Sequence, residues 1–185
     1  MRITGGIARG VTLGSPRAPG VRPTTDRVRT ALFNILSGYG LDGTRVADLF
    51  AGTGSLGIEA LSRGAAHASF IESDRRQVVV IRTNLRVAGF AERATVHLGR
   101  VEASIDRLNS LNLALMDPPY TKPFPASLIA AIGAGDALSS GAILVCGHAS
   151  RVPANDRCGA LVKWDDRKYG DSSLAFYSRE HEVPA

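Results

Sequence analysis

The chain has 185 residues, of which 44% are hydrophobic, and a formal net charge of +5. That length fits one domain with an ample core, and no apolar run approaches the roughly 20 residues that a membrane helix needs. We therefore expect no membrane partner, and the positive charge favours an anionic partner such as nucleic acid.

Residues 1–25 form a basic, glycine-rich segment with no acidic residue before Asp26. Their spaced apolar side chains predict a small β-hairpin arm, followed by a main domain over residues 26–185. Arginine guanidinium groups with glycine flexibility suit a phosphate backbone, and a mobile, solvated segment is the alternative. The residues of this arm predicted to contact RNA are Arg2, Arg9, Arg22 and Thr24.

A helix is predicted to begin near Asp26, which can cap its first N–H groups, and to end before Gly38. Arg27 and Arg29 stand in its first turn, where the helix dipole disfavours cations. Contact with an external anion such as RNA would explain both residues, and ordinary surface arginines are the alternative.

Residues 45–72 are typical of a strand, a tight turn, a helix and a second strand. Asp48 lies in the first strand, Gly52 and Gly54 form the turn, and Glu72 ends the second strand. Glycine tolerates the dihedral angles of such a turn, and the N-terminus of the following helix is electropositive. A carboxylate at the tip of the neighbouring strand can accept hydrogen bonds from ribose hydroxyls. The unit therefore predicts a cofactor that contains a nucleoside.

The identity of that cofactor is a separate question. The glycine spacing matches the dinucleotide fingerprint G-x-G-x-x-G, so NAD is one candidate. Asp48 favours a ligand with an ammonium-bearing tail, as in S-adenosylmethionine, over one with a pyrophosphate. A glycine turn that only packs a helix onto a sheet is the third interpretation. The predicted cofactor contacts on this unit are Asp48, Phe50, Gly52, Gly54, Glu72 and Ser73.

A third strand is predicted to end near Leu98. The loop after it should emerge at the same edge of a parallel sheet as the loops after the first two strands, where ligands bind in such folds. Arg100 and Val101 in this loop are therefore predicted to approach the cofactor.

A fourth strand over residues 111–116 delivers the segment Asp117-Pro118-Pro119-Tyr120. Two consecutive prolines cannot continue a strand, so the chain leaves the sheet in a rigid shape. The Asp117 carboxylate and the Pro118 carbonyl then form two acceptors for the exocyclic amino group of a base, on which Tyr120 can stack. We predict that these four residues form the catalytic site, with a structural turn as the alternative.

The remaining segments complete the predicted architecture. Lys122 belongs to a loop expected to close over the substrate, and a fifth strand and a terminal hairpin give an α/β sheet with an antiparallel edge. Cys146 and Cys158 form no disulfide framework, and no metal spacing links the cysteines or histidines. We therefore expect no metal, free thiols and a reducing, cytoplasmic location without a signal peptide.

Four stretches resemble the RsmD-like family of 16S ribosomal RNA guanine-N2 methyltransferases: residues 2–6 with 9–10, 22–29, 48–57 and 117–120. The last two are shared with many amino-methyltransferases, whereas the first two are particular to the family. The resemblance implies a Rossmann-like class I methyltransferase fold, with a seven-stranded, mostly parallel sheet and an antiparallel C-terminal hairpin. It implies S-adenosylmethionine as cofactor, S-adenosylhomocysteine as product and one guanine of the small ribosomal subunit as target. Relatives typically have Asp or Asn at the position of Arg100, so backbone atoms could contact the adenine there instead.

Several alternatives stay open. Adenine-N6 methylation of RNA or DNA is the first, because the same Asp-Pro-Pro-Tyr segment serves both bases. An NAD-dependent oxidoreductase is the second, although no acid or base for hydride transfer is evident. The third is a non-catalytic RNA-binding assembly factor. We expect the chain to act as a monomer.

Overall fold

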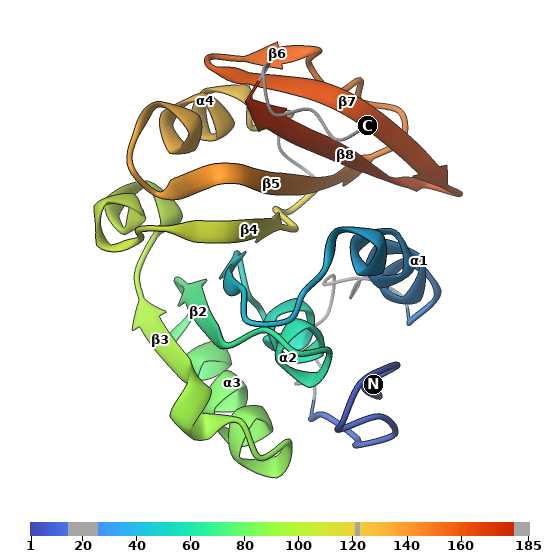
Figure 1. Cartoon of the computed structure of the whole chain (residues 1–185), viewed down its shortest axis with the longest axis vertical. Helices are drawn as coiled ribbons and strands as arrows, with labels where there is room; N and C mark the ends of the chain where they lie inside the picture. The colour runs from blue at the N-terminus through green and yellow to red at the C-terminus, as the bar shows by residue number, and fades with distance from the viewer. Residues whose placement is uncertain (15–25, 121–122, 180–185) are drawn as a thin grey trace.

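A single mixed sheet forms the centre of the protein (Figure 1), whose computed structural model describes residues 1–14, 26–120 and 123–179. The strand order is β3-β2-β1-β4-β5-β8-β7-β6. Strands β1 to β5 pair in parallel, and β5, β8, β7 and β6 pair antiparallel. The strands are β1 (Arg45–Leu49), β2 (His67–Glu72), β3 (Ala94–Leu98), β4 (Leu111–Met116), β5 (Leu138–Ala149), β6 (Arg157–Cys158), β7 (Leu161–Tyr169) and β8 (Ser172–Arg179).

The observed sheet has eight strands rather than the predicted seven. The additional strand is β6, whose two residues pair with the start of β7. A strand of this length leaves no alternating pattern in the sequence, because the side-chain period of two needs several residues to become visible. The Rossmann-like arrangement with an antiparallel C-terminal hairpin is confirmed.

Helical segments precede the first strand and connect the parallel strands that follow, as the sequence predicts for an α/β fold. They are α1 (Asp26–Leu36), α2 (Ser55–Ser62), α3 (Arg75–Val87), α4 (Ala126–Ala134) and the 3₁₀ turns η1 (Ser37–Tyr39), η2 (Ala91–Arg93), η3 (Val101–Ala103) and η4 (Ile105–Arg107). The helix predicted after the third strand is thus two short turns, which suits the few apolar positions there.

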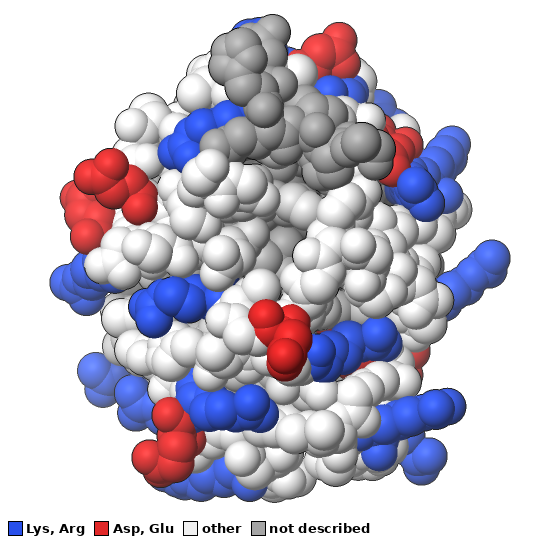
Figure 2. Space-filling model, in the orientation of Figure 1, with Lys and Arg blue, Asp and Glu red and all other residues white. Residues whose placement is uncertain are grey.

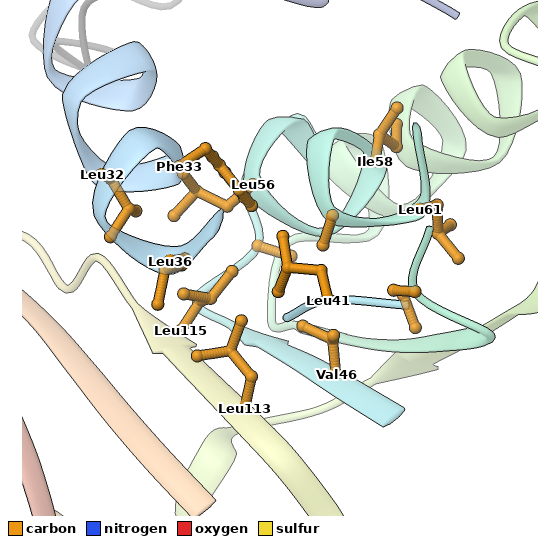
Figure 3. Packing of buried hydrophobic residues seen from close by; sticks show 14 of the residues in the cluster. Leu32, Phe33, Leu36, Leu41, Val46, Leu56, Ile58, Leu61, Leu113 and Leu115 are labelled. Carbon is orange, nitrogen blue, oxygen red and sulfur yellow. The ribbon is translucent and has the colours of Figure 1, made fainter. Parts of the chain in front are cut away.

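Two hydrophobic clusters cover the two faces of the sheet, because successive side chains of a strand point to opposite faces. Val46 on β1 belongs to the cluster that contains α1 and α2, whereas its neighbour Ala47 belongs to the cluster that contains α4. Figure 3 shows the first cluster, in which Leu36 of α1 lies near Leu113 and Leu115 of β4. Asp48 is two residues after Val46 and therefore lies on the face that α1 and α2 cover.

The N-terminal arm is packed against α2. Arg2 and Thr12 form an antiparallel bridge, and Ile3 is buried in the first cluster. The backbone N–H and the hydroxyl of Thr4 donate to the buried carboxylate of Glu59 at 2.8 and 2.7 Å. These bonds satisfy a charged group that would be costly to bury alone.

Candidate active site

The glycine turn between β1 and α2 is fixed by two carboxylates of the sheet. Asp48 Oδ2 accepts a hydrogen bond from Gly57 N at 2.8 Å, and Glu72 Oε2 accepts one from Gly52 N at 2.8 Å. Gly52 and Gly54 have φ angles of 55° and 78°, which L side chains rarely adopt. The turn therefore depends on its glycines, as the sequence predicts.

Phe50, directly before the glycine turn, has a strained backbone conformation. Its φ is 65°, in the left-handed region that costs a non-glycine residue roughly 1–2 kcal/mol. Such residues cluster at functional sites. The ring is half-buried against the second cluster, and Ser73 is exposed beside Glu72. Both predicted contacts thus lie at the same edge of the sheet as the glycine turn.

Three carboxylates lie on one face of the sheet at this edge. Asp48 is paired with Phe70 on β2 and with Leu115 on β4. Glu72 and Asp117 each lie two residues after those partners, so the period of two places both on the Asp48 face. The sequence placed the three acids at strand ends, and the strand register brings them together.

The electrostatics of this group are unusual. Burial raises the pKa of Asp48 from 3.8 to about 8; the Gly57 hydrogen bond lowers it, and the nearby charges of Asp117 and Glu72 raise it. Among the described residues, neither Asp48 nor Glu72 forms an ion pair with a lysine or arginine. These two carboxylates therefore suit a cationic ligand, because an opposite charge stabilises the ionised form.

The Asp117-Pro118-Pro119-Tyr120 segment leaves β4 beside β5. A Cβ on Gly147 of β5 would come within 2.6 Å of Asp117 Oδ1 and 3.2 Å of the Tyr120 hydroxyl. Burial raises the pKa of that hydroxyl above its ordinary value, and the nearby negative charge of Asp117 raises it further. The aspartate and the tyrosine therefore lie together against β5.

A small cavity of about 10 Å³ adjoins this segment. It is lined by Pro118, Pro119, Tyr120, Pro123, Phe124, Pro125, Gly147, His148, Ala149 and Val152. One water molecule nearly fills such a volume, so this cavity is too small for a nucleobase. An open hollow of about 660 Å³ lies between α1 and β7, but none of the three carboxylates lines it.

The loop after β3 carries the last two predicted cofactor contacts. The Arg100 side chain is exposed, and its Nε lies 3.6 Å from Glu102 Oε2. Val101 is 2% exposed and belongs to the second cluster, so its side chain packs inside the fold. The structure brings this loop to the edge where β2 ends, since Gly99 N donates to Glu72 O at 2.9 Å.

The predicted RNA contacts of the arm and the first helix lie in two environments. Arg2, Arg9 and Arg27 are exposed, whereas Arg29 is completely buried. Arg29 Nη2 lies 3.0 Å from Asp26 Oδ1 and also donates to the Arg2 carbonyl. Arg29 Nε lies 3.4 Å from Glu59 Oε2, an ion pair that lacks the geometry of a hydrogen bond. The prediction that Arg29 contacts RNA is therefore wrong, because the buried acid on α2 binds its charge inside the fold. Arg22, Thr24 and Lys122 lie outside the described residues.

Two residues of the site were missed in the sequence. Gly147 lies in a strand of small and apolar residues, and only the contact with Asp117 reveals its importance. Asn84 lies in α3 and donates to the carbonyl of Thr53 in the glycine turn at 2.9 Å. A polar residue on the apolar side of an amphipathic helix is the signal that could have identified it.

The described residues also bear on metal binding and on membrane insertion. No group of histidine, cysteine, aspartate and glutamate side chains there could hold a metal ion. No helix in the same part of the chain has both the length and the apolar character needed to cross a membrane.

The sheet order, the glycine turn and the acids at its edge define a class I methyltransferase fold. A family described as conserved hypothetical protein 95 matches residues 1–178, and the chain belongs to this RsmD-like family. YlbH of Bacillus subtilis (strain 168) is 32% identical over 97% of this chain and 99% of its own length. Ribosomal RNA small subunit methyltransferase D of Escherichia coli (strain K12) is 40% identical over 66% of this chain and 61% of its own length.

Solved structures share this fold. A hypothetical protein of Thermus thermophilus has a TM-score of 0.81 at 30% identity, covering 95% of this chain and 98% of that one. An RNA methyltransferase of Salinibacter ruber, in complex with S-adenosyl-L-homocysteine, has a TM-score of 0.64 at 20% identity, covering 88% and 97%. The second likeness concerns the fold alone.

Proposed function

We propose that the protein transfers a methyl group from S-adenosylmethionine to the exocyclic N2 of a guanine in small-subunit (16S) ribosomal RNA. The observation that carries the proposal is the placement of Asp117 on the same sheet face as Asp48 and Glu72. The group of three carboxylates therefore adjoins both the glycine turn and the Asp-Pro-Pro-Tyr segment. The name of the E. coli relative supports the choice of RNA.

The residues around the turn fit S-adenosylmethionine. Its sulfonium and ammonium groups are cations, and the turn is bordered by carboxylates whose mutual repulsion contributes to the raised pKa of Asp48. Glu72 lies at the tip of β2, where ribose hydroxyls are bound in such folds. When bound, S-adenosylmethionine supplies an electrophilic methyl group.

Asp117 has the role of orienting the target amino group. The nitrogen lone pair of that group is delocalised into the base, and two acceptors on its N–H bonds direct the lone pair out of the ring plane. The Asp117 carboxylate and the Pro118 carbonyl are these acceptors, and Asp117 then accepts the proton that the amino group loses. Holding two bound reactants in line is worth up to roughly 7–11 kcal/mol in favourable systems. Tyr120 stacks on the extruded base.

The charge of the surface supports a nucleic-acid partner. α3 exposes Arg75, Arg76, Arg82 and Arg86, and Figure 2 shows basic side chains over the lower part of the face, where Figure 1 places α3 and the arm. Arginines that cluster on one face are the electrostatic footprint of phosphate binding. The arm adds two further exposed arginines, Arg2 and Arg9.

The decisive experiment uses unmodified small ribosomal subunits and labelled S-adenosylmethionine. Labelled RNA is digested to nucleosides and analysed by mass spectrometry, and the labelled position is mapped. We expect N2-methylguanosine at one position. N6-methyladenosine would support the alternative activity, and binding of NAD in place of S-adenosylmethionine in a thermal-shift assay would overturn the methyltransferase proposal.

A further inference from the structure

Asn84 joins the glycine turn to Gly14 of the N-terminal arm. It is 1% exposed and lies in α3, between the two segments. Its Nδ2 donates to Thr53 O at 2.9 Å and to Gly14 O at 3.0 Å, and its Oδ1 accepts from Gly14 N at 2.8 Å. One side chain therefore binds two segments that are separate in the chain.

These contacts require an amide. Two backbone carbonyls can only accept, so both N–H groups of one NH₂ are needed, and the Gly14 N–H can only donate, so it needs an oxygen. Aspartate has the same shape but would place a carboxylate oxygen against the two carbonyl oxygens. Leucine would leave three backbone groups without their present partner, which is costly in a buried position.

The backbone of the glycine turn needs support from the α3 side. Thr53 lies between Gly52 and Gly54, both with positive φ, and glycine backbone has access to many other conformations. Glu72 holds the Gly52 N–H from the sheet, and Asn84 holds the Thr53 carbonyl from α3. Glu72 on β2 and Asn84 on α3 therefore hold the turn between them.

We propose that Asn84 is a positioning residue for the glycine turn, and that Gly14 of the arm supports it in this role. The inference rests on the proposed function, because the turn is taken to hold S-adenosylmethionine. It adds a physical connection between the arm predicted to contact RNA and the segment predicted to bind the cofactor.

The test is the affinity of the full chain for S-adenosylhomocysteine, measured by calorimetry. We expect Asn84→Asp to weaken binding about tenfold or more, since it loses both bonds that Nδ2 donates. Gly14→Pro removes the donor to Oδ1 and sets a ring carbon against that oxygen, so it disturbs the amide from the arm side without changing Asn84 itself, and we expect a smaller loss of about threefold. Gly14 is exposed, so this variant carries the test if Asn84→Asp does not fold.

Ser62→Ala is the matched control. Ser62 is 1% exposed on α2, its Oγ donates to Gly5 O at 2.6 Å and accepts from Ala8 N at 3.0 Å, and it does not contact the turn. It should lower the thermal midpoint and leave the affinity for S-adenosylhomocysteine unchanged. A merely structural role for Asn84 would make the two variants alike in both measurements.

The outcomes are distinct. Wild-type affinity in both Asn84→Asp and Gly14→Pro, or an equal loss in Ser62→Ala, would overturn the inference while leaving the proposed function intact. Wild-type affinity in Gly14→Pro alone would overturn the supporting role of the arm. Failure of the wild-type protein to bind S-adenosylhomocysteine would overturn the proposed function and this inference with it.

Discussion

The carboxylate of Asp117 occupies the space that a side chain at Gly147 would need. Asp117 directly follows β4 and Gly147 lies in β5, and these strands are neighbours because Met116 at the end of β4 is paired with Cys146 on β5. A Cβ at position 147 would lie 2.6 Å from Asp117 Oδ1, a distance that real Cβ atoms essentially never show. The position of Asp117, the proposed acceptor for the amino group, thus depends on the absence of a side chain at position 147 of β5.

Gly147→Ala should therefore impair methylation without removing any functional group. A displacement of about 1 Å in a reacting group can cost about a hundredfold in rate, and we expect a loss of that order in single-turnover methylation of small subunits. Gly38→Ala is the control, because a Cβ there meets nothing within 4 Å. A wild-type rate for Gly147→Ala would show that Asp117 does not need its present position.

Removal of the Asp117 carboxylate should separate catalysis from cofactor binding. We expect Asp117→Ala to abolish detectable methylation and to retain affinity for S-adenosylmethionine, because the turn and Glu72 are unchanged. Labelled-methyl incorporation and calorimetry measure the two properties. Loss of cofactor binding in this variant would contradict the division of roles, and full activity would remove Asp117 from the reaction.

The raised pKa of Asp48 links stability to pH. The unfolded chain ionises Asp48 near 3.8 and the folded protein near 8, so the folded state holds the extra proton in this window. Stability is then greatest below the unfolded value and falls as the pH rises toward the folded one. Asp48→Asn still offers an acceptor to Gly57 N but does not titrate. We expect the variant to gain stability relative to wild type from about pH 4 to about pH 8.

Urea denaturation at several pH values measures this difference. Asp42→Asn serves as the control, because Asp42 is exposed and its substitution should leave the pH profile unchanged. Parallel profiles for wild type and Asp48→Asn would show that Asp48 ionises normally in the folded protein.

The buried arginine should be a stability residue rather than an RNA contact. Arg29→Ala leaves the Glu59 carboxylate without one of its two arginine partners inside the fold. Loss of one member of a buried pair typically costs about 3–5 kcal/mol in the free energy of unfolding, and we expect a loss of this order. Arg27→Ala, at an exposed position of the same helix turn, should change it by no more than about 0.5 kcal/mol. Equal effects in denaturant titrations would contradict this assignment.

Local sequence signals predicted the glycine turn, the strand ends and the order of elements, because each depends on neighbouring residues. The strand register then placed Asp48, Glu72 and Asp117 on one face, which alternation alone could not decide before the pairing was known. Arg29 was misplaced because its partner Glu59 is distant in sequence, and a lone arginine in a first helical turn is typical of a surface.

The contacts of Gly147 and Asn84 are also tertiary. No pattern within β5 distinguishes a glycine that makes room for a carboxylate from one that only loosens a strand. β6 was missed because two residues are too few for a periodic signal.

The arm also has a consequence for the order of synthesis. Gly14 and its partner Asn84 are separated by 70 residues in the chain. At the usual translation rate of about 5–20 residues per second, about 4 to 14 s pass between the two, apart from passage through the ribosomal tunnel. During that interval Gly14 has been made but its Asn84 partner has not, so this contact of the arm with α3 can form only after the contacts of the arm with Glu59 and Ser62 of α2 have become possible.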